Sequence, residues 1–132
     1  MGIKRFFKNK IKDYHFIKNR RKVTANLQNL DFFKNHPFNF STEINPEVSI
    51  IIHDVDDLKT ILNCLYYIQK YDQNISREII VINDKNIDEI NSYLGNIKGI
   101  ILINPEENLG LVKSLNYTIE KAKGKFIYLL DS

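Results

Sequence analysis

The chain has 132 residues, a net charge of +3 and a single cysteine, Cys64. A chain of this length fits one domain with a modest core, and one cysteine excludes an internal disulfide, so we expect a reducing compartment. Cys64 falls within an apolar helical stripe, which favours a small buried side chain over a nucleophile. No apolar run approaches the length of a membrane span, and the charged start is unlike a secretory signal. We therefore expect a cytoplasmic location, or a peripheral one on the inner face of a membrane.

The basic residues are concentrated at the amino terminus. Residues 1–22 carry nine basic side chains and one acid, so the remaining residues carry −5 within the total of +3. Apolar side chains recur there at helix-like intervals, which predicts a basic amphipathic helical extension. They are Phe6, Phe7, Ile11, Tyr14 and Ile17. Such a helix lies on an anionic membrane surface or packs on the protein with a solvated face, and both readings stay open. Nucleic acid is not expected as a partner, because nothing downstream supplies a recognition module.

Residues 23–46 are expected to form a linker. The segment is rich in Asn, holds Pro37 and Pro46, and offers only scattered apolar anchors. A short helix near Asn26–Asn35 followed by an extended arm fits this composition. The compact domain is expected to cover residues 47–132.

Short apolar runs alternate with helical patterns from residue 47 onward. The runs occupy residues 48–52, 78–82, 99–103 and 126–130. Repeated strand–helix units with apolar strands predict an α/β, Rossmann-like fold with a mainly parallel sheet of about four strands flanked by helices. The last run is expected to be a buried strand. The helix before it is expected to bury one apolar stripe, formed by Val112, Leu115, Ile119 and Ala122.

Polar residues follow every predicted strand. The carboxyl ends of parallel strands meet at one edge of the sheet, and ligands of open α/β sheets bind there. The sequence contains neither a dinucleotide fingerprint nor a P-loop, and it has no His and Cys cluster for zinc. Carboxylates at strand ends, with a helix beginning at Gly110, suit a nucleotide whose phosphates meet helix N–H groups. Lys113, in the first turn of that helix, is either within reach of a phosphate or simply exposed.

Four segments of this part carry a family resemblance. They are residues 46–52, residues 78–84, Glu107–Gly110 together with Asn116, and residues 122–132. In this order and spacing they resemble the nucleotide-sugar-binding half of family 2 glycosyltransferases, which have the GT-A fold. The resemblance covers residues 46–132, so it implies an incomplete, GT-A-like domain over residues 47–132.

The resemblance also implies site residues and partners. His53, Asp54, Val55 and Asp84 would hold the nucleotide base, and the family's D-x-D would begin at Asp131 and carry Mg²⁺ or Mn²⁺ with the sugar diphosphate. The donor would be a nucleotide-diphosphate sugar and the acceptor a saccharide or a lipid-linked acceptor, in cell-surface polysaccharide synthesis. The expected nucleotide-sugar-binding residues are His53, Asp54, Val55, Asp84, Asn108, Gly110, Lys113 and Asp131.

The chain departs from the family pattern at several positions. His53–Asp56 stands where Pro-Val-Tyr-Asn is usual, Asn83–Asn86 where Asp-Asp-Gly-Ser is frequent, and Leu115 where an arginine is common. The second aspartate of D-x-D and the acceptor half with its catalytic base would follow Ser132. We therefore expect a donor-binding half, truncated at the start of D-x-D, with no catalytic residue of its own and little activity alone. Two alternatives remain, a non-catalytic remnant or interaction module of the same fold and a basic membrane-surface adaptor.

Overall fold

The computed structural model describes residues 27–71, 74–106 and 109–132. Its helices and strands are, in chain order, α2 (Leu30–Lys34), β1 (Val48–His53), α3 (Leu58–Lys70), β2 (Arg77–Ile82), α4 (Asp88–Leu94), β3 (Ile100–Ile103), α5 (Gly110–Lys121) and β4 (Phe126–Asp131). The helical extension predicted over residues 1–22 lies outside the described residues.

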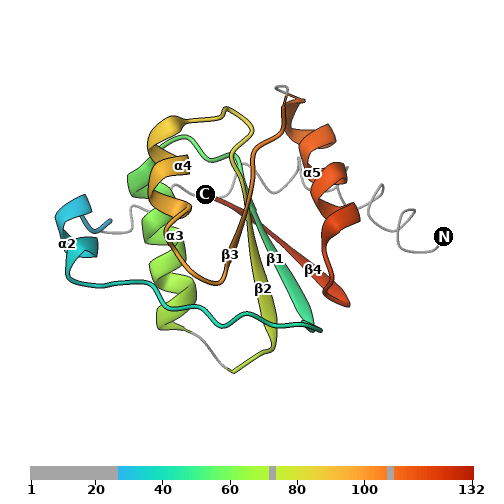
Figure 1. The fold of residues 1–132 in the computed structure, drawn as a ribbon, viewed down its shortest axis with the longest axis horizontal. Helices are drawn as coiled ribbons and strands as arrows, with labels where there is room; N and C mark the ends of the chain where they lie inside the picture. Colours follow the sequence, from blue (N-terminus) through green and yellow to red (C-terminus); the bar gives the residue numbers. More distant parts are fainter. Residues whose placement is uncertain (1–26, 72–73, 107–108) are drawn as a thin grey trace.

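The four strands form one parallel sheet in the order β3-β2-β1-β4 (Figure 1). β1 is central, and it pairs with β2 on one side and with β4 on the other. The chain moves outward from β1 to β2 and β3, then returns across the sheet to β4. The predicted Rossmann-like parallel sheet flanked by helices is confirmed, and the strand order reverses between β1 and β4.

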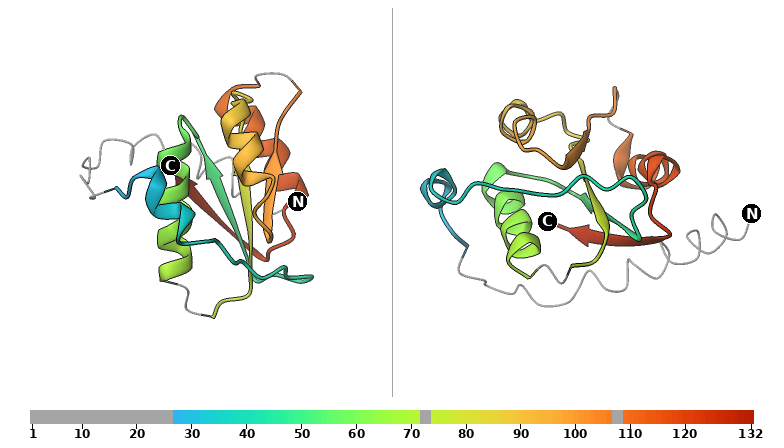
Figure 2. Two further views of the ribbon diagram at one scale, coloured as in Figure 1. Left: turned by 60° about the vertical axis from the view of Figure 1, so that its left-hand side comes forward. Right: turned by 60° about the horizontal axis from the view of Figure 1, so that its bottom comes forward.

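Helices cover both faces of the sheet, with α3 and α5 on opposite sides (Figure 2). Alternate strand residues point to opposite faces, so Ile52 packs in a cluster with α3 and α4, whereas Ile51 packs with Leu115 of α5. The start of α3 is fixed by Asp57, whose side chain accepts a hydrogen bond from the Thr60 N–H at 2.8 Å.

The segment before β1 contributes to this core. Phe33 of α2 and Phe40 of the following arm are 2% and 6% exposed and belong to the cluster beneath α3 and α4. A Cβ at Gly99 would lie 2.3 Å from the carbonyl oxygen of Phe40, so the arm passes directly against the residue before β3. Residues 33–40 thus pack on the domain, while the proposed boundary at residue 47 stays a prediction.

Two expectations about burial were wrong. Phe126 and Tyr128 are 63% and 57% exposed, because β4 pairs only with β1 among the described strands and lies at the sheet edge. Val112 is 48% exposed, and α5 buries Ser114 and Thr118 beside Leu115 instead. The Thr118 hydroxyl donates to the Ser114 carbonyl oxygen at 2.9 Å, which satisfies that hydroxyl inside the interface.

A buried polar network joins the strands at the opposite end from their carboxyl termini. The Glu78 carboxylate accepts hydrogen bonds from the Ser49 hydroxyl at 2.5 Å and from the Lys123 N–H at 2.6 Å. The Gly124 N–H donates to the same hydroxyl at 2.8 Å. Because Glu78 is 6% exposed, this carboxylate depends on these donors, and the network fixes the start of β4 against β1.

Replacing Gly124 by alanine should destabilise the fold, because its Cβ would lie 2.4 Å from the Ser49 main-chain nitrogen. We expect the free energy of unfolding to fall by about 2 kcal/mol or more, measured by urea denaturation. Gly110→Ala is the matched control, since a Cβ there meets nothing within 4 Å and only the positive φ of 71° is strained. That control should cost about 1 kcal/mol. Equal losses for the two variants would contradict the close approach at Gly124.

Candidate functional site

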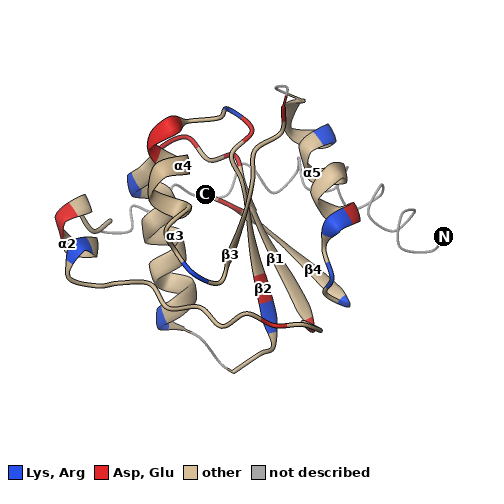
Figure 3. Ribbon diagram, viewed as in Figure 1, with Lys and Arg blue, Asp and Glu red and all other residues tan. Residues whose placement is uncertain are grey.

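The candidate site lies at the carboxyl ends of the strands, where the strand order reverses. In open α/β sheets, ligands bind outside the carboxyl ends of the strands at such a reversal point. His53 and Asp131 are partners in register at the ends of these two strands. Acidic residues gather along the loops at this end of the sheet (Figure 3). The edge that the sequence predicted to hold the site is therefore the acidic edge of the molecule.

The end of β1 is held close to the end of β4. The Ser132 N–H donates to the His53 carbonyl oxygen at 3.3 Å, and its hydroxyl donates to the Asp54 carbonyl oxygen at 3.1 Å. His53 is 2% exposed, so its ring is buried at the end of β1. Asp54 has a φ of 54°, a left-handed conformation that Asp tolerates better than most residues and that turns the chain sharply after the strand.

The loop after β2 is organised by Asn83, which is fully buried. Its side-chain oxygen accepts from the Ile87 N–H at 3.0 Å, and its amide nitrogen donates to the Ile87 carbonyl at 3.1 Å and to Asn91 at 2.8 Å. Its main-chain N–H donates to the Ile103 carbonyl oxygen at 2.9 Å. Asn83 thus ties the loop to α4 and to β3, and it holds the two residues that follow it at the edge.

Lys85 bridges the loops after β1 and β2. Its ammonium forms an ion pair and hydrogen bond with Asp56 and lies 3.9 Å from Asp54. The hydrogen bond to Asp56, supported by the charges of the neighbouring carboxylates, outweighs desolvation and raises the pKa of Lys85. The ammonium therefore stays charged at neutral pH and offsets part of the negative charge of the edge.

Asp84 presents a buried acceptor at the same edge. Its Oδ1 atom is inaccessible to solvent and has no hydrogen-bond partner among the described residues. A buried carboxylate oxygen without a donor is costly, and such atoms are rare in folded proteins unless a ligand or water supplies the donor. Asp84 Oδ1 is thus an acceptor at this edge that a donor from a water or a ligand would satisfy.

Helix α5 begins beside this edge. Gly110 is its first residue and has a φ of 71°, and no side chain caps the helix at Leu109. No acidic residue lies in the first turn, and Lys113 is exposed there. The helix end and this lysine suit an anion. Asn108, the other residue predicted here, lies outside the described residues.

Two further residues do not act through their side chains at this edge. Val55 is fully buried in the core cluster beneath α3, so only its main chain is left to face a ligand. Burial raises the pKa of the Cys64 thiol to about 12, so Cys64 is protonated at neutral pH and unsuited to nucleophilic attack. This agrees with its expected role as a packing residue.

The metal that the resemblance implies has few ligands here. Asp131 is exposed at the end of β4, and residues 27–71, 74–106 and 109–132 contain no group of three or more side chains able to form a metal cage. Mg²⁺ often needs only one or two carboxylates, because substrate phosphates and water complete its coordination. Asp131 fits a shared site of that kind and does not fit a dedicated protein cage.

Open parallel α/β sheets with acidic and helix-terminal groups at the reversal point form a broad class of nucleotide-binding folds. The family described as Glycosyl transferase family 2 matches residues 48–132, and the chain belongs to this family. The match covers the whole sheet and its helices, so a glycosyltransferase-type function and a partial GT-A domain follow for this part of the chain. In general such a domain binds a nucleotide-sugar donor and an acceptor, and a divalent metal is common in the family. A search of curated proteins found no match.

Within the described parts of the chain, no helix is both long and apolar enough to cross a bilayer.

Sequence reasoning did not identify two positioning residues, Asn83 and Lys85. Asn83 appeared only within the family-like segment and as a departure from its usual residues, although an Asn at a strand end, five residues before the first residue of α4, is a usual loop anchor. Lys85 and Asp56 are 29 residues apart in the chain, so a local sequence pattern does not predict their ion pair.

Asn83→Ala should loosen the loop after β2, because the Ile87 N–H loses its partner and the Ile87 carbonyl oxygen loses one of two donors, keeping the Asn91 N–H. We expect the free energy of unfolding to fall by about 2–3 kcal/mol and amide exchange in residues 84–87 to become faster. Asn96→Ala is the control, since Asn96 is exposed and its side chain donates one hydrogen bond, to the Ser92 carbonyl oxygen, among the described residues. It should cost less than about 0.5 kcal/mol. Unchanged exchange in residues 84–87 of Asn83→Ala would show that Asn83 does not hold this loop.

Proposed function

We propose that this chain is the donor-binding part of a glycosyltransferase that moves a sugar from a nucleotide-diphosphate sugar to a saccharide or a lipid-linked acceptor. Cell-surface polysaccharide synthesis is the setting that we infer for this transfer. The observation that carries the proposal is the buried, partnerless Oδ1 of Asp84 at the edge where the strand order reverses.

The base of the nucleotide is proposed to lie over the ends of β1 and β2. A base N–H would donate to the half-buried Asp84 carboxylate, and His53 with the main chain of Asp54 and Val55 would form the surrounding wall. Uridine is the nucleoside to test first, because its ring carries one N–H between two carbonyl groups. The Asp84 carboxylate accepts from that N–H, and the neighbouring Lys85 ammonium is a donor for a carbonyl oxygen.

The sugar diphosphate is proposed to lie between Asp131 and the amino terminus of α5. Gly110, Lys113 and the predicted Asn108 would face the phosphates, since helix N–H groups and an ammonium both favour anions. Mg²⁺ or Mn²⁺, held by Asp131 together with phosphate oxygens and water, would neutralise the leaving diphosphate. The acceptor hydroxyl also requires a general base. We assign no such base within this chain, whose residues bind and orient the donor.

A uridine diphosphate titration tests this proposal. The chain should bind uridine diphosphate weakly in the presence of Mg²⁺ or Mn²⁺, and Asp84→Ala should weaken binding by about five- to tenfold through loss of one hydrogen bond. Calorimetry or an NMR titration measures both. Asp88→Ala is the matched control, because Asp88 is an exposed residue of the first turn of α4.

Loss of affinity on omitting the metal, with a further loss in Asp131→Asn only when metal is present, would support the metal assignment. Absence of any response at millimolar nucleotide would instead favour the alternative that the chain is a non-catalytic remnant or interaction module of the same fold.

The basic segment over residues 1–22 is proposed to attach the protein to an anionic membrane, on the cytoplasmic face, where a lipid-linked acceptor is concentrated. Its nine basic side chains and its Phe and Ile residues suit charge attraction combined with shallow insertion. The intact chain should sediment with anionic liposomes in 0.1 M salt and much less in 1 M salt, because the Debye length falls from about 10 Å to about 3 Å. A variant lacking Met1–Lys22 should remain in solution. Equal sedimentation of the two proteins, or equal binding to neutral liposomes, would mean that this segment serves no membrane role.

A further inference from the structure

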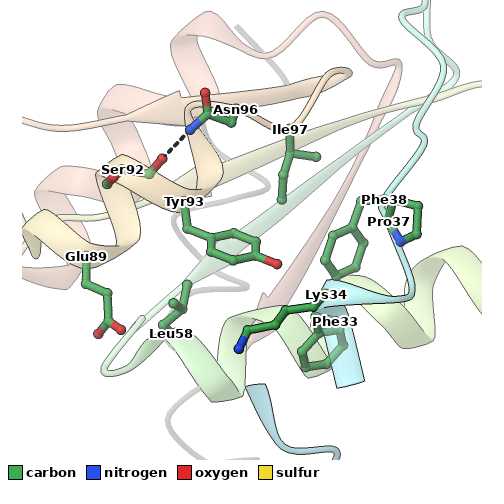
Figure 4. A pocket seen from close by; sticks show the side chains of 10 residues that line it. All are labelled: Phe33, Lys34, Pro37, Phe38, Leu58, Glu89, Ser92, Tyr93, Asn96 and Ile97. Atoms are coloured by element: carbon green, nitrogen blue, oxygen red, sulfur yellow. Dashed lines mark hydrogen bonds between the residues drawn. The ribbon is translucent and has the colours of Figure 1, made fainter. Parts of the chain in front are cut away.

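A second candidate binding site lies on the α3 and α4 side of the sheet. It is a pocket of about 610 Å³ between α4, the start of α3 and the arm that follows α2 (Figure 4). This volume falls within the usual range for small-molecule sites, about 300–1,000 Å³. Leu58 and Glu89 belong to the first turns of α3 and α4. The pocket therefore extends from the same edge of the sheet as the nucleotide site, but on one face of it.

Three aromatic residues line the pocket. Phe33 and Phe38 approach from α2 and the arm, and Tyr93 approaches from α4 on the other side (Figure 4). Phe33 is buried in the core and stacks with Phe38 at a centroid distance of 5.7 Å, so the half-buried rings of Phe38 and Tyr93 offer the accessible aromatic surface. An aromatic face carries negative charge density and attracts the weakly positive C–H groups of a ring that lies flat on it.

Polar groups of opposite charge border the same space. Glu89 and Lys34 both line the pocket, and Asn96 lies at its far end, where its amide nitrogen donates to the Ser92 carbonyl oxygen at 2.7 Å. A ligand anion placed near Glu89, or a ligand cation placed near Lys34, would be repelled. Hydroxyl groups suit both positions, because they donate to the carboxylate and accept from the ammonium.

We propose that this pocket binds a neutral saccharide at a site separate from that of the nucleotide. A pyranose ring combines a C–H face with equatorial hydroxyls, which matches an aromatic wall bordered by a carboxylate, an ammonium and an amide. The choice of a saccharide among neutral polar ligands rests on the proposed function, whereas the pocket and its lining do not. A saccharide held there would lie beside the proposed donor site.

The test is an NMR titration of the full chain with three neutral disaccharides, cellobiose, lactose and chitobiose. We expect at least one to shift the amide signals of Glu89, Tyr93 and Asn96 with millimolar affinity. Glu89→Gln should weaken that binding at least threefold, and Tyr93→Ala should abolish it. Glu47→Gln is the matched control, an exposed glutamate before β1 that does not line the pocket, and it should bind like the original chain. Tyr93→Phe retains the ring in case Tyr93→Ala does not fold, and it should keep most of the affinity.

Charge provides a second measurement. Cellobiose carrying a carboxylate in place of one primary alcohol should bind more weakly than cellobiose to the original chain, and Glu89→Gln should remove that difference. The proposal is overturned if no disaccharide shifts these signals at 10 mM, or if Glu89→Gln and Tyr93→Ala leave the shifts unchanged. It is also overturned if binding appears only after residues 1–26 are removed, since that segment would then be the occupant. If uridine diphosphate binds and no disaccharide does, the donor-site proposal stands and the saccharide proposal is overturned. If a disaccharide binds and uridine diphosphate does not, only the saccharide proposal stands.

Discussion

The central position of β1 is the constraint on which the rest of the structure depends. β1 pairs in parallel with β2 on one side and with β4 on the other. Its register with these strands therefore fixes which residues lie side by side at the amino ends and at the carboxyl ends of the strands. At one edge, Ser49 receives the Gly124 N–H and donates to Glu78. At the other edge, the same register brings His53 beside Asp131. The buried network at the amino ends of the strands thus helps to fix the register that brings residues together at the candidate site, at the carboxyl ends.

The functional edge concentrates charge that the fold does not neutralise by itself. Carboxylates follow three of the four strands there, and Lys85 is the cation that bridges two of the loops. Exposed ion pairs of this kind contribute about 1 kcal/mol or less to stability, so their importance is geometric. They hold Asp54 and Asp56 toward the loop after β2, whereas Asp84 Oδ1 stays buried without a donor. Side chains of this kind suit a ligand that donates an N–H group to Asp84 and shares a bound cation with Asp131.

Most of the fold could be predicted from the chain, because apolar periodicity distinguishes strands from helices without knowledge of their neighbours. Apolar periodicity does not reveal the order of the strands in the sheet. Residues 126–130 look as apolar as residues 48–52, yet β4 lies at the edge and β1 at the centre, so Phe126 and Tyr128 remain exposed. The error at Val112 has a different cause. Helix α5 packs Ser114 and Thr118 against the sheet, and the Thr118 hydroxyl is hydrogen-bonded within the helix. A prediction based on hydrophobicity alone therefore placed Val112 in the buried face in error.

The candidate site was predictable in position and only partly in detail. Parallel strands must end at one edge, so residues after the strands were expected to meet there, and His53 and Asp131 do so. The contacts between loops were not predictable, because they depend on the relative heights of the loops after β1 and β2.

Those contacts also bear on how the departures from the family pattern are to be read. Asp54 and Asp56 replace uncharged family residues in one loop, and Lys85 replaces a glycine in another. Two unrelated losses of a binding motif would leave these new charges at arbitrary positions. Here the two changes meet, since the Lys85 ammonium pairs with Asp56 and lies 3.9 Å from Asp54. The Lys85 ion pairs and the hydrogen bonds of Asn83 join the loops after β1 and β2 into one connected arrangement, and Asp84 Oδ1 has no hydrogen-bond donor among the described residues. The departures from the family pattern in these two loops are therefore structurally linked.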